Sequence, residues 1–152
     1  MLRLSKKADY ALMAMKHLAL RGDRGSSSAR EIAEQYDIPI ELMAKVLANA
    51  RLWSDGLVER GFKVVRHGDL VTPIVPVLVE DDWKAGLLWK ALYESGVYVN
   101  VAIHPAVPPG GALLRTSVMA THDTPTLERA LDAFASVKAS FEAEHGPLPS
   151  AS

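Results

Sequence analysis

The chain contains 152 residues, has a formal net charge of −1 and lacks cysteine. This length fits one domain or two very small ones, and the missing cysteines exclude disulfide bonds, thiolate metal sites and cysteine nucleophiles. Hydrophobic residues make up 49% and charged residues 23%, which is ordinary for a soluble globular protein, and no apolar stretch predicts a membrane span or a secretion signal. We therefore expect a cytoplasmic protein that does not bind membranes.

The small net charge hides an uneven distribution of charge along the chain. Residues 1–68 hold 12 Lys and Arg against 8 Asp and Glu, whereas residues 69–152 hold 5 against 10. A basic first part and an acidic second part favour two modules with different partners. Two solvated surfaces with a chance imbalance are the alternative.

Three helices are predicted within the first 47 residues. Ser5 suits an N-cap and precedes apolar residues at helical spacing, and a capping box of Ser28 and Glu31 starts a short second helix. Pro39 suits the first turn of a third helix. The residues expected on the buried side of that helix are Leu42, Met43, Val46 and Leu47. Two helices joined by a short turn are typical of a helix-turn-helix.

The remaining sequence predicts a small sheet with helices. A helix is expected over residues 48–57, with its end at Gly56, and strands over residues 62–66 and 72–79. A helix from Asp81 to Gly96, strands over residues 97–103 and 113–119, and a last helix capped by Thr124 follow. We therefore predict the α+β class, with helix-turn-helix helices followed by a β-α-β-β-α module whose antiparallel sheet carries helices. The predicted domains are residues 1–48 and 49–145, and residues 146–152 are expected to form a disordered tail.

Residues 1–47 resemble the DNA-binding half of the iron–sulfur cluster regulator family of winged-helix repressors. The matching segments include LSKK at residues 4–7, YALMAM at 10–15 and IAE at 32–34. The resemblance implies that the third helix enters the major groove of double-stranded DNA and that basic residues near helix N-termini contact phosphates. The residues expected at the DNA are Arg3, Lys6, Lys7, Tyr10, Ser28, Arg30, Ile40, Glu41, Ala44 and Lys45.

Residues 49–138 resemble the C-terminal domain of the α-oxoamine synthases, which are PLP-dependent enzymes, and in particular the serine palmitoyltransferase type. The most specific segments are PAVPPG at residues 105–110 and LLRTSVMATH at 113–122. The resemblance implies that Arg115 matches the strand arginine that binds the amino-acid carboxylate, a task suited to a guanidinium fork. The family's Schiff-base lysine belongs to a large domain that this sequence lacks. We therefore expect no cofactor, no catalytic residue and no enzymatic activity, with Arg115 as a partly exposed strand residue or a relic carboxylate site.

Three functional hypotheses follow. The first is a small DNA-binding transcription regulator whose catalytically inactive second module serves for association or sensing. The second is a protein-binding module, for example an antitoxin-like neutraliser, that binds a partner or a second copy through an apolar face. The third is an inert chimera, recombined or engineered, without enzymatic activity. The five histidines are scattered without metal-ligand spacing, so no metal site is predicted.

Overall fold

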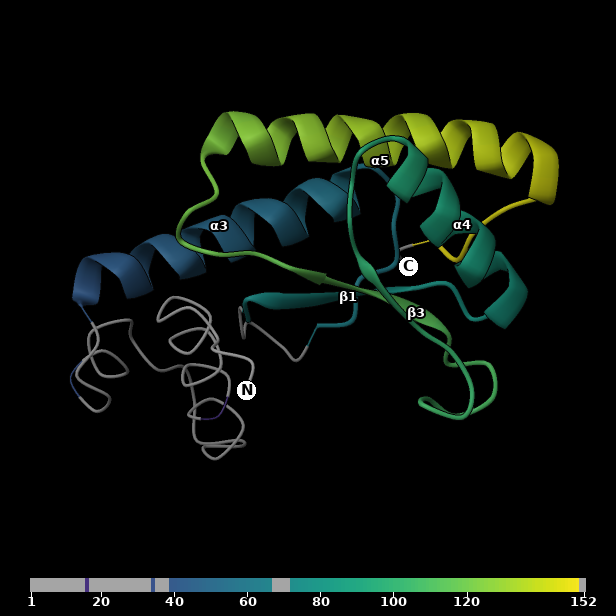
Figure 1. The fold of residues 1–152 in the computed structure, drawn as a ribbon, viewed down its shortest axis with the longest axis horizontal. Helices are drawn as coiled ribbons and strands as arrows, with labels where there is room; N and C mark the ends of the chain where they lie inside the picture. Colours follow the sequence, from purple (N-terminus) through teal and green to yellow (C-terminus); the bar gives the residue numbers. More distant parts are fainter. Residues whose placement is uncertain (1–15, 17–33, 35–38, 67–71, 151–152) are drawn as a thin grey trace.

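The computed structural model describes residues 16, 34, 39–66 and 72–150 of the chain (Figure 1). The elements are helix α3 (Ile40–Glu59), strand β1 (Ile74–Leu78), helix α4 (Asp82–Glu94), strand β2 (Asn100–Ala102), strand β3 (Leu113–Ser117) and helix α5 (Thr124–His145). The α+β class and the β-α-β-β-α order after α3 are confirmed. The first two predicted helices lie almost wholly outside the described residues, so the helix-turn-helix detail is not confirmed.

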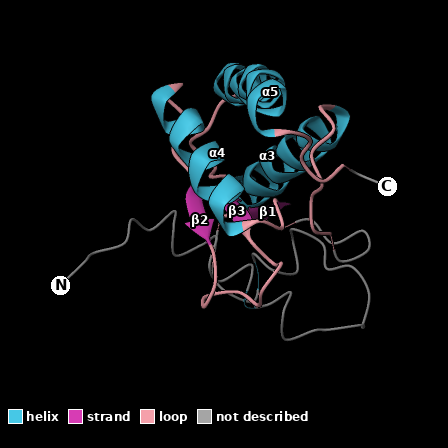
Figure 2. Ribbon diagram, turned by 90° about the vertical axis from the view of Figure 1, so that its right-hand side faces the viewer, coloured by secondary structure: helices cyan, strands magenta, loops and turns pink. Residues whose placement is uncertain are grey.

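The three strands form an antiparallel sheet with β3 in the centre. The helices lie on one side of this sheet (Figure 2), where α3 and α4 contact the strands and α5 packs across α3 and α4. Side chains alternate between the two faces along each strand. The strand residues buried on the helix side include Val75, Val77, Leu114 and Thr116. The other face carries no helix among the described elements.

Helix α3 runs past the glycine at which the sequence predicts its end. Gly56 lies inside the helix and is buried. A Cβ atom at this position would come within 2.4 Å of the Cδ1 atom of Leu131 in α5. The glycine therefore serves the close approach of α3 to α5 and does not end the helix.

The end of α3 is a Schellman motif centred on Gly61. This glycine has a φ of +77°, in the left-handed region that favours glycine. The Gly61 N–H donates to the Val58 carbonyl at 2.9 Å, and the Phe62 N–H donates to the Leu57 carbonyl at 3.0 Å. These two bonds satisfy carbonyl groups that have no partner within the helix. Both Leu57 and Phe62 are buried in the core, which is the apolar contact that commonly accompanies this motif.

Aspartates cap the other two helices. The Asp81 side chain accepts from the Lys84 N–H at 2.7 Å, and the Asp123 side chain accepts from the Thr126 N–H at 2.9 Å. The predicted cap of the last helix is therefore wrong, because Thr124 is the first residue of α5 and the preceding aspartate makes the capping bond. Hydrogen bonds from Thr126 are the main cause that lowers the pKa of Asp123 from its ordinary value of 3.8, since they favour the ionised carboxylate.

All four predicted strands are shorter in the structure, and two of them are changed most. Residues 62–66 form an isolated bridge, Val64 with Val77, supported by a 3.0 Å bond from the Val65 N–H to the Pro76 carbonyl. The strand expected over residues 97–103 is reduced to β2. The Ile103 carbonyl accepts from the N–H of residue 106 at 2.8 Å, so a turn begins where the strand was expected to continue.

One hydrophobic core joins α3 to the sheet and to α5. Trp53, Phe62 and Phe134 meet in it, with the Phe134 ring centroid 5.4 Å from each of the other two in edge-to-face geometry. All three are at most 4% exposed, and burying a large apolar side chain stabilises a fold by about 1.5–3 kcal/mol. The predicted domain boundary after residue 48 therefore lies inside one continuous helix, whose second half belongs to this core.

The C-terminal segment also packs on the core as far as Leu148. The Leu148 side chain is buried, and its N–H donates to Glu142 Oε1 at 2.9 Å. Lys84 Nζ donates to the Pro147 carbonyl at 3.1 Å. The hydrogen bond from Lys138 is the main cause that lowers the pKa of Glu142, and the Leu148 N–H adds to it. The sequence predicts a disordered tail from residue 146, whereas the structure holds the chain in place through Leu148.

No helix within residues 39–66 and 72–150 combines the length and the apolar character needed to cross a membrane.

Candidate functional site

The helix-free face of the sheet presents Arg115 at its centre. Arg115 lies in the middle of the central strand β3, and the register places it opposite Pro76 of β1 and Asn100 of β2. Its neighbours Leu114 and Thr116 are buried toward the helices, whereas Arg115 is exposed. The strand alternation therefore directs the guanidinium away from the core and onto the open face. This position agrees with the expected exposed strand arginine.

Arg115, like Arg51 and Arg129, has no carboxylate partner among the described residues, whereas Arg60 and Arg66 do. Arg60 pairs with Asp132 at 3.0 Å, and Arg66 pairs with Asp55 at 2.7 Å. No such ion pair joins Arg115 to an acidic side chain within residues 39–66 and 72–150. Its guanidinium can therefore offer a planar pair of N–H donors to a carboxylate from outside this segment.

The loop between β2 and β3, which carries the PAVPPG segment, consists of consecutive tight turns. The N–H of Ala106 donates to the Ile103 carbonyl at 2.8 Å, and the N–H of Gly111 donates to the Pro108 carbonyl at 2.9 Å. A Cβ atom at position 111 would lie 3.0 Å from the Pro108 oxygen, so glycine suits the second turn. This loop joins β2 to β3, and in the resulting pairing Arg115 lies opposite Asn100.

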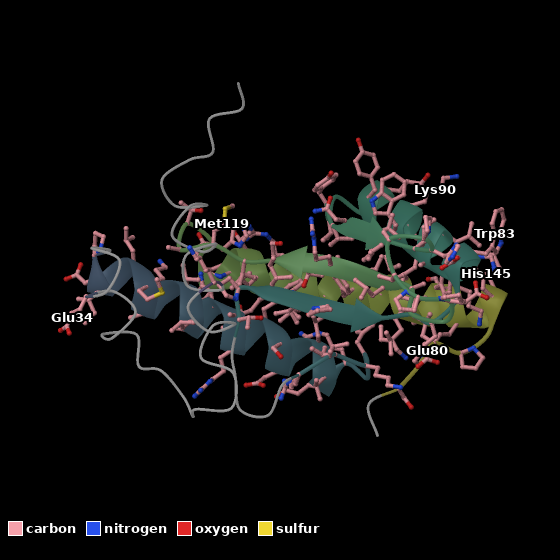
Figure 3. The ribbon with its side chains drawn as sticks, turned by 90° about the horizontal axis from the view of Figure 1, so that it is seen from below. Glu34, Glu80, Trp83, Lys90, Met119 and His145 are labelled. Atoms are coloured by element: carbon pink, nitrogen blue, oxygen red, sulfur yellow. The ribbon has the colours of Figure 1, made fainter. Side chains whose placement is uncertain are left out.

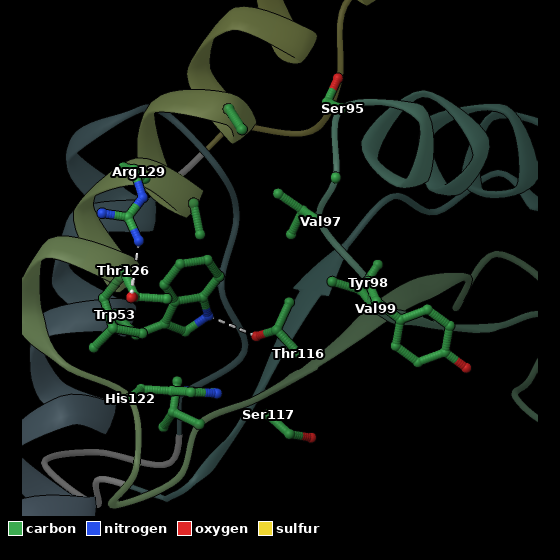
Figure 4. Close-up of a pocket in the computed structure, with 15 residues that line it drawn as sticks. Trp53, Ser95, Val97, Tyr98, Val99, Thr116, Ser117, His122, Thr126 and Arg129 are labelled. Atoms are coloured by element: carbon green, nitrogen blue, oxygen red, sulfur yellow. Dashed lines mark hydrogen bonds between the residues drawn. The ribbon is translucent and has the colours of Figure 1, made fainter.

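A cavity of about 510 Å³ lies between Trp53 of α3, the connection from α4 to β2, the end of β3 and the first turns of α5. Figure 4 shows its labelled side chains around the Trp53 indole. Trp53 Nε1 donates to Thr116 Oγ1 at 2.7 Å, and Arg129 Nη2 donates to Thr126 Oγ1 at 3.0 Å. Arg115 does not line this cavity. The cavity was not predicted, because its walls come from four separate parts of the chain.

Asn49 ties α3 to the segment that leads from β3 into α5. It is 6% exposed, and its Nδ2 donates to the Met119 carbonyl at 2.8 Å and to the His122 carbonyl at 2.9 Å. The signal in the sequence is a polar residue on the apolar side of a helix, one turn before Trp53. A buried amide in this position needs partners, and it finds them in backbone carbonyls of the turn.

The predicted DNA-contacting residues are only partly described by the structure. Ile40, Glu41, Ala44 and Lys45 lie in the first two turns of α3 and are exposed. The other six, which are Arg3, Lys6, Lys7, Tyr10, Ser28 and Arg30, lie outside the described residues. The structure therefore does not test how these ten residues are placed relative to one another.

Known proteins with similar sequences are enzymes. No protein-family model matches the chain. A serine palmitoyltransferase from Bacteriovorax stolpii is 36% identical over 101 residues, which are 66% of this chain and 23% of that protein. An 8-amino-7-oxononanoate synthase from Symbiobacterium thermophilum is 40% identical over 109 residues, covering 72% of this chain and 26% of the synthase. A putative 8-amino-7-oxononanoate synthase 2 from Mycobacterium tuberculosis is 37% identical over 125 residues, which are 82% of this chain and 14% of that protein.

Solved structures agree with this result. A serine palmitoyltransferase with its PLP internal aldimine superposes with a TM-score of 0.62 at 34% identity, covering 66% of this chain and 25% of the enzyme. The serine palmitoyltransferase of Sphingomonas wittichii has a TM-score of 0.62 at 33% identity, covering 68% and 26%. A segment of this chain resembles the C-terminal domain of the α-oxoamine synthases.

The chain spans about a quarter or less of the length of these curated α-oxoamine synthase relatives. The match to the mycobacterial synthase comprises 125 residues, whereas only 104 residues follow residue 48, since the chain ends at 152. That match therefore includes residues upstream of position 48, within the part that the sequence assigns to a helix-turn-helix.

The hypothesis of a DNA-binding transcription regulator is wrong. The similar proteins are serine palmitoyltransferases and 8-amino-7-oxononanoate synthases, and no comparison supports the winged-helix resemblance. The antitoxin-like module and the inert chimera have no support either. The physical reason for the error is that two capped amphipathic helices with a short turn occur in many folds. The predicted recognition helix is instead the start of α3, whose later turns enter the core of the α-oxoamine synthase-like domain.

Proposed function

We propose that residues 40–148 act as the C-terminal domain of a PLP-dependent α-oxoamine synthase, in which Arg115 binds the carboxylate of the amino-acid substrate. The observation that supports this most directly is the position of Arg115 at the centre of the helix-free sheet face, without a carboxylate partner among the described residues. The similarity to serine palmitoyltransferases, which are named for an amino-acid substrate, supports the same proposal.

In this function Arg115 orients the substrate and takes no part in making or breaking bonds. Two parallel N–H···O bonds fix the plane of a carboxylate and therefore the direction of the groups attached to the neighbouring carbon. A lysine in the same place keeps the positive charge but loses the planar fork. The central strand of a sheet is a rigid support for such a group, because both neighbouring strands hold its backbone.

Three of the described lysines are already paired with carboxylates. PLP would be held through an uncharged lysine amine. Lys63 Nζ lies 3.0 Å from Glu80 Oε1, Lys138 Nζ lies 2.8 Å from Glu142 Oε1 and Lys90 Nζ lies 3.7 Å from Glu94 Oε1, so these three do not suit that task. No described lysine lines the cavity beside α5. We therefore propose that PLP binding needs residues outside this segment and that the chain alone does not catalyse the synthase reaction.

A chimera tests the proposal. The matched C-terminal part of the Bacteriovorax stolpii serine palmitoyltransferase is replaced by residues 40–148 of this chain, and the absorption of bound PLP reports whether the chimera folds. We expect condensation of serine with palmitoyl-CoA by the chimera and none by the chain alone. Arg115→Gln is expected to raise KM for serine by about tenfold or more, because one charge-assisted bidentate pair is lost.

Arg115→Lys is the matched control, since it keeps the charge, and its KM for serine is expected to lie between those of the parent chimera and Arg115→Gln. The Arg51→Gln variant removes an equal charge from the exposed side of α3 and is expected to leave KM unchanged. A chimera that binds PLP and turns over serine with the same KM in the Arg115→Gln variant would refute the proposed role of Arg115.

A further inference from the structure

The cavity beside α5 has an apolar floor. The Trp53 indole N–H is already used by Thr116, whose own hydroxyl donates to the Val75 carbonyl at 2.6 Å. Both polar groups of the floor are therefore satisfied, and the indole offers its apolar ring to the cavity. Two valines from the α4–β2 connection, Val97 and Val99, and Leu127 of α5 complete the apolar walls.

The edge of the same cavity is rich in hydrogen-bond donors. Arg129 Nη2 donates to Thr126 Oγ1, which leaves further N–H groups of the guanidinium for a ligand. The His122 Nδ1 accepts from the Met119 N–H at 3.3 Å. In the neutral imidazole this bond assigns the proton to Nε2, which is then a donor. In Figure 4, Arg129 lies above the Trp53 ring, bonded to Thr126 beside the ring, and His122 lies below the ring.

No acidic side chain of the described residues lines the cavity. Asp123, whose pKa is lowered first by Thr126 and to a smaller extent by Arg129, caps α5 and is not part of the wall. The lining side chains within the described part of the chain therefore carry the positive charge of Arg129 and no negative charge. A cation with apolar floor and walls suits an anion that has a hydrocarbon chain.

We propose that this cavity is a binding site for a small amphipathic carboxylate. The carboxylate lies at Arg129, and the hydrocarbon chain lies over Trp53 and against the two valines. The volume of about 510 Å³ is within the range of small-molecule sites. The site is distinct from the one proposed at Arg115, which projects from the other face of β3, and it does not depend on the synthase assignment.

Titration of the full chain with octanoate tests this site. We expect saturable binding in the millimolar range or tighter by calorimetry, together with a shift of the Trp53 indole N–H resonance. Acetate has the same carboxylate but almost no hydrocarbon chain, and 1-octanol has the same hydrocarbon chain but no charge. Both are expected to bind about tenfold more weakly or worse, since each loses one half of the contacts. The absence of saturable octanoate binding in the millimolar range would refute the proposal.

Variants locate the site. Arg129→Gln is expected to weaken octanoate binding by about tenfold or more and to leave octanol binding unchanged, because it removes the charge-assisted bonds alone. Arg129→Lys keeps the positive charge and is expected to retain part of the affinity for octanoate. Thermal unfolding of each variant checks that a loss of affinity is not a loss of folding. Arg51→Gln, with the same change of charge on α3, is expected to bind octanoate normally. Octanoate binding that survives Arg129→Gln, or that is lost in Arg115→Gln, would place the ligand elsewhere and overturn the proposal.

Discussion

Thr116 shows how a single hydroxyl group connects three elements of the core. It is 2% exposed, accepts from the indole of Trp53 in α3 at 2.7 Å and donates to the Val75 carbonyl of β1 at 2.6 Å. Buried polar groups are costly unless they are paired, and no buried side-chain nitrogen or oxygen of the described residues lacks a partner. The same hydroxyl also keeps the cavity floor apolar, so one residue serves both stability and the proposed site.

Replacing Thr116 by valine is expected to lower the free energy of unfolding by about 1–3 kcal/mol. The change keeps the shape of the side chain but leaves the Trp53 indole N–H buried without an acceptor. The midpoint of urea unfolding, followed by far-UV circular dichroism, measures the loss. Thr121→Val at an exposed position is the control and should change stability by no more than about 0.5 kcal/mol. In a Trp53→Phe background, Thr116→Val should lower the free energy of unfolding by a smaller amount, because no indole N–H is left without an acceptor. An equal loss in both backgrounds would contradict this explanation.

At the scale of elements, the two helical glycines have opposite surroundings. A Cβ atom at Gly56 in α3 would meet Leu131, whereas a Cβ atom at Gly86 in α4 would have no neighbour within 4 Å. The first glycine therefore sets the distance between α3 and α5. The second adds backbone freedom without a packing benefit, since glycine destabilises a helix interior by up to about 1 kcal/mol relative to alanine.

Alanine at these two positions is expected to change stability in opposite directions. Gly86→Ala should stabilise the protein by about 0.5–1 kcal/mol through helix propensity. Gly56→Ala should destabilise it by about 1–2 kcal/mol, because overpacking against Leu131 outweighs the same gain. Thermal unfolding of both variants beside the parent measures the difference. A stabilising Gly56→Ala would show that Leu131 moves aside without cost and that the close contact does not limit the packing of α3 on α5.

At the scale of the whole molecule, the described chain has one core to which α3, the sheet, α4 and α5 all contribute. Phe134 of α5 lies at the junction, in contact with the rings of Trp53 and Phe62. The sequence predicts two modules joined near residue 48, and such an arrangement permits two separate unfolding transitions. A shared core instead favours one cooperative unit over residues 40–148.

We therefore expect residues 40–148 to unfold in one transition. Near-UV circular dichroism of the aromatic side chains and far-UV circular dichroism of the helices should give the same urea midpoint. Phe134→Ala should shift both midpoints together, with a loss of about 3–5 kcal/mol from the cavity it creates. Two separated transitions within these residues, or a shift of one probe alone, would show that α3 is not coupled to the rest of the core.

The sequence alone was sufficient for features that depend on neighbouring residues. The helical spacing of Leu88 and Leu92, and of Leu127, Leu131 and Phe134, predicts α4 and α5. The order of strands and helices after residue 72 was likewise predicted. The resemblance to the C-terminal domain of the α-oxoamine synthases, which the segments LLRTSVMATH and PAVPPG carry, is confirmed by the comparisons. The first 47 residues led to the wrong prediction of a DNA-binding regulator, because capped amphipathic helices are common to many folds.

Only the tertiary structure decided features that depend on residues far apart in the chain. Gly56 reads locally as a helix end, and its contact with Leu131 exists only once α5 has packed on α3. The cavity likewise combines Trp53, the α4–β2 connection, β3 and Arg129, whose distances no local pattern specifies. The sequence by itself determined the elements and the family likeness, since periodicity and turn chemistry act within a few residues. The packing of the elements determined the core, the open face of Arg115 and the cavity, since burial and hydrogen bonding act between residues that only the folded chain brings together.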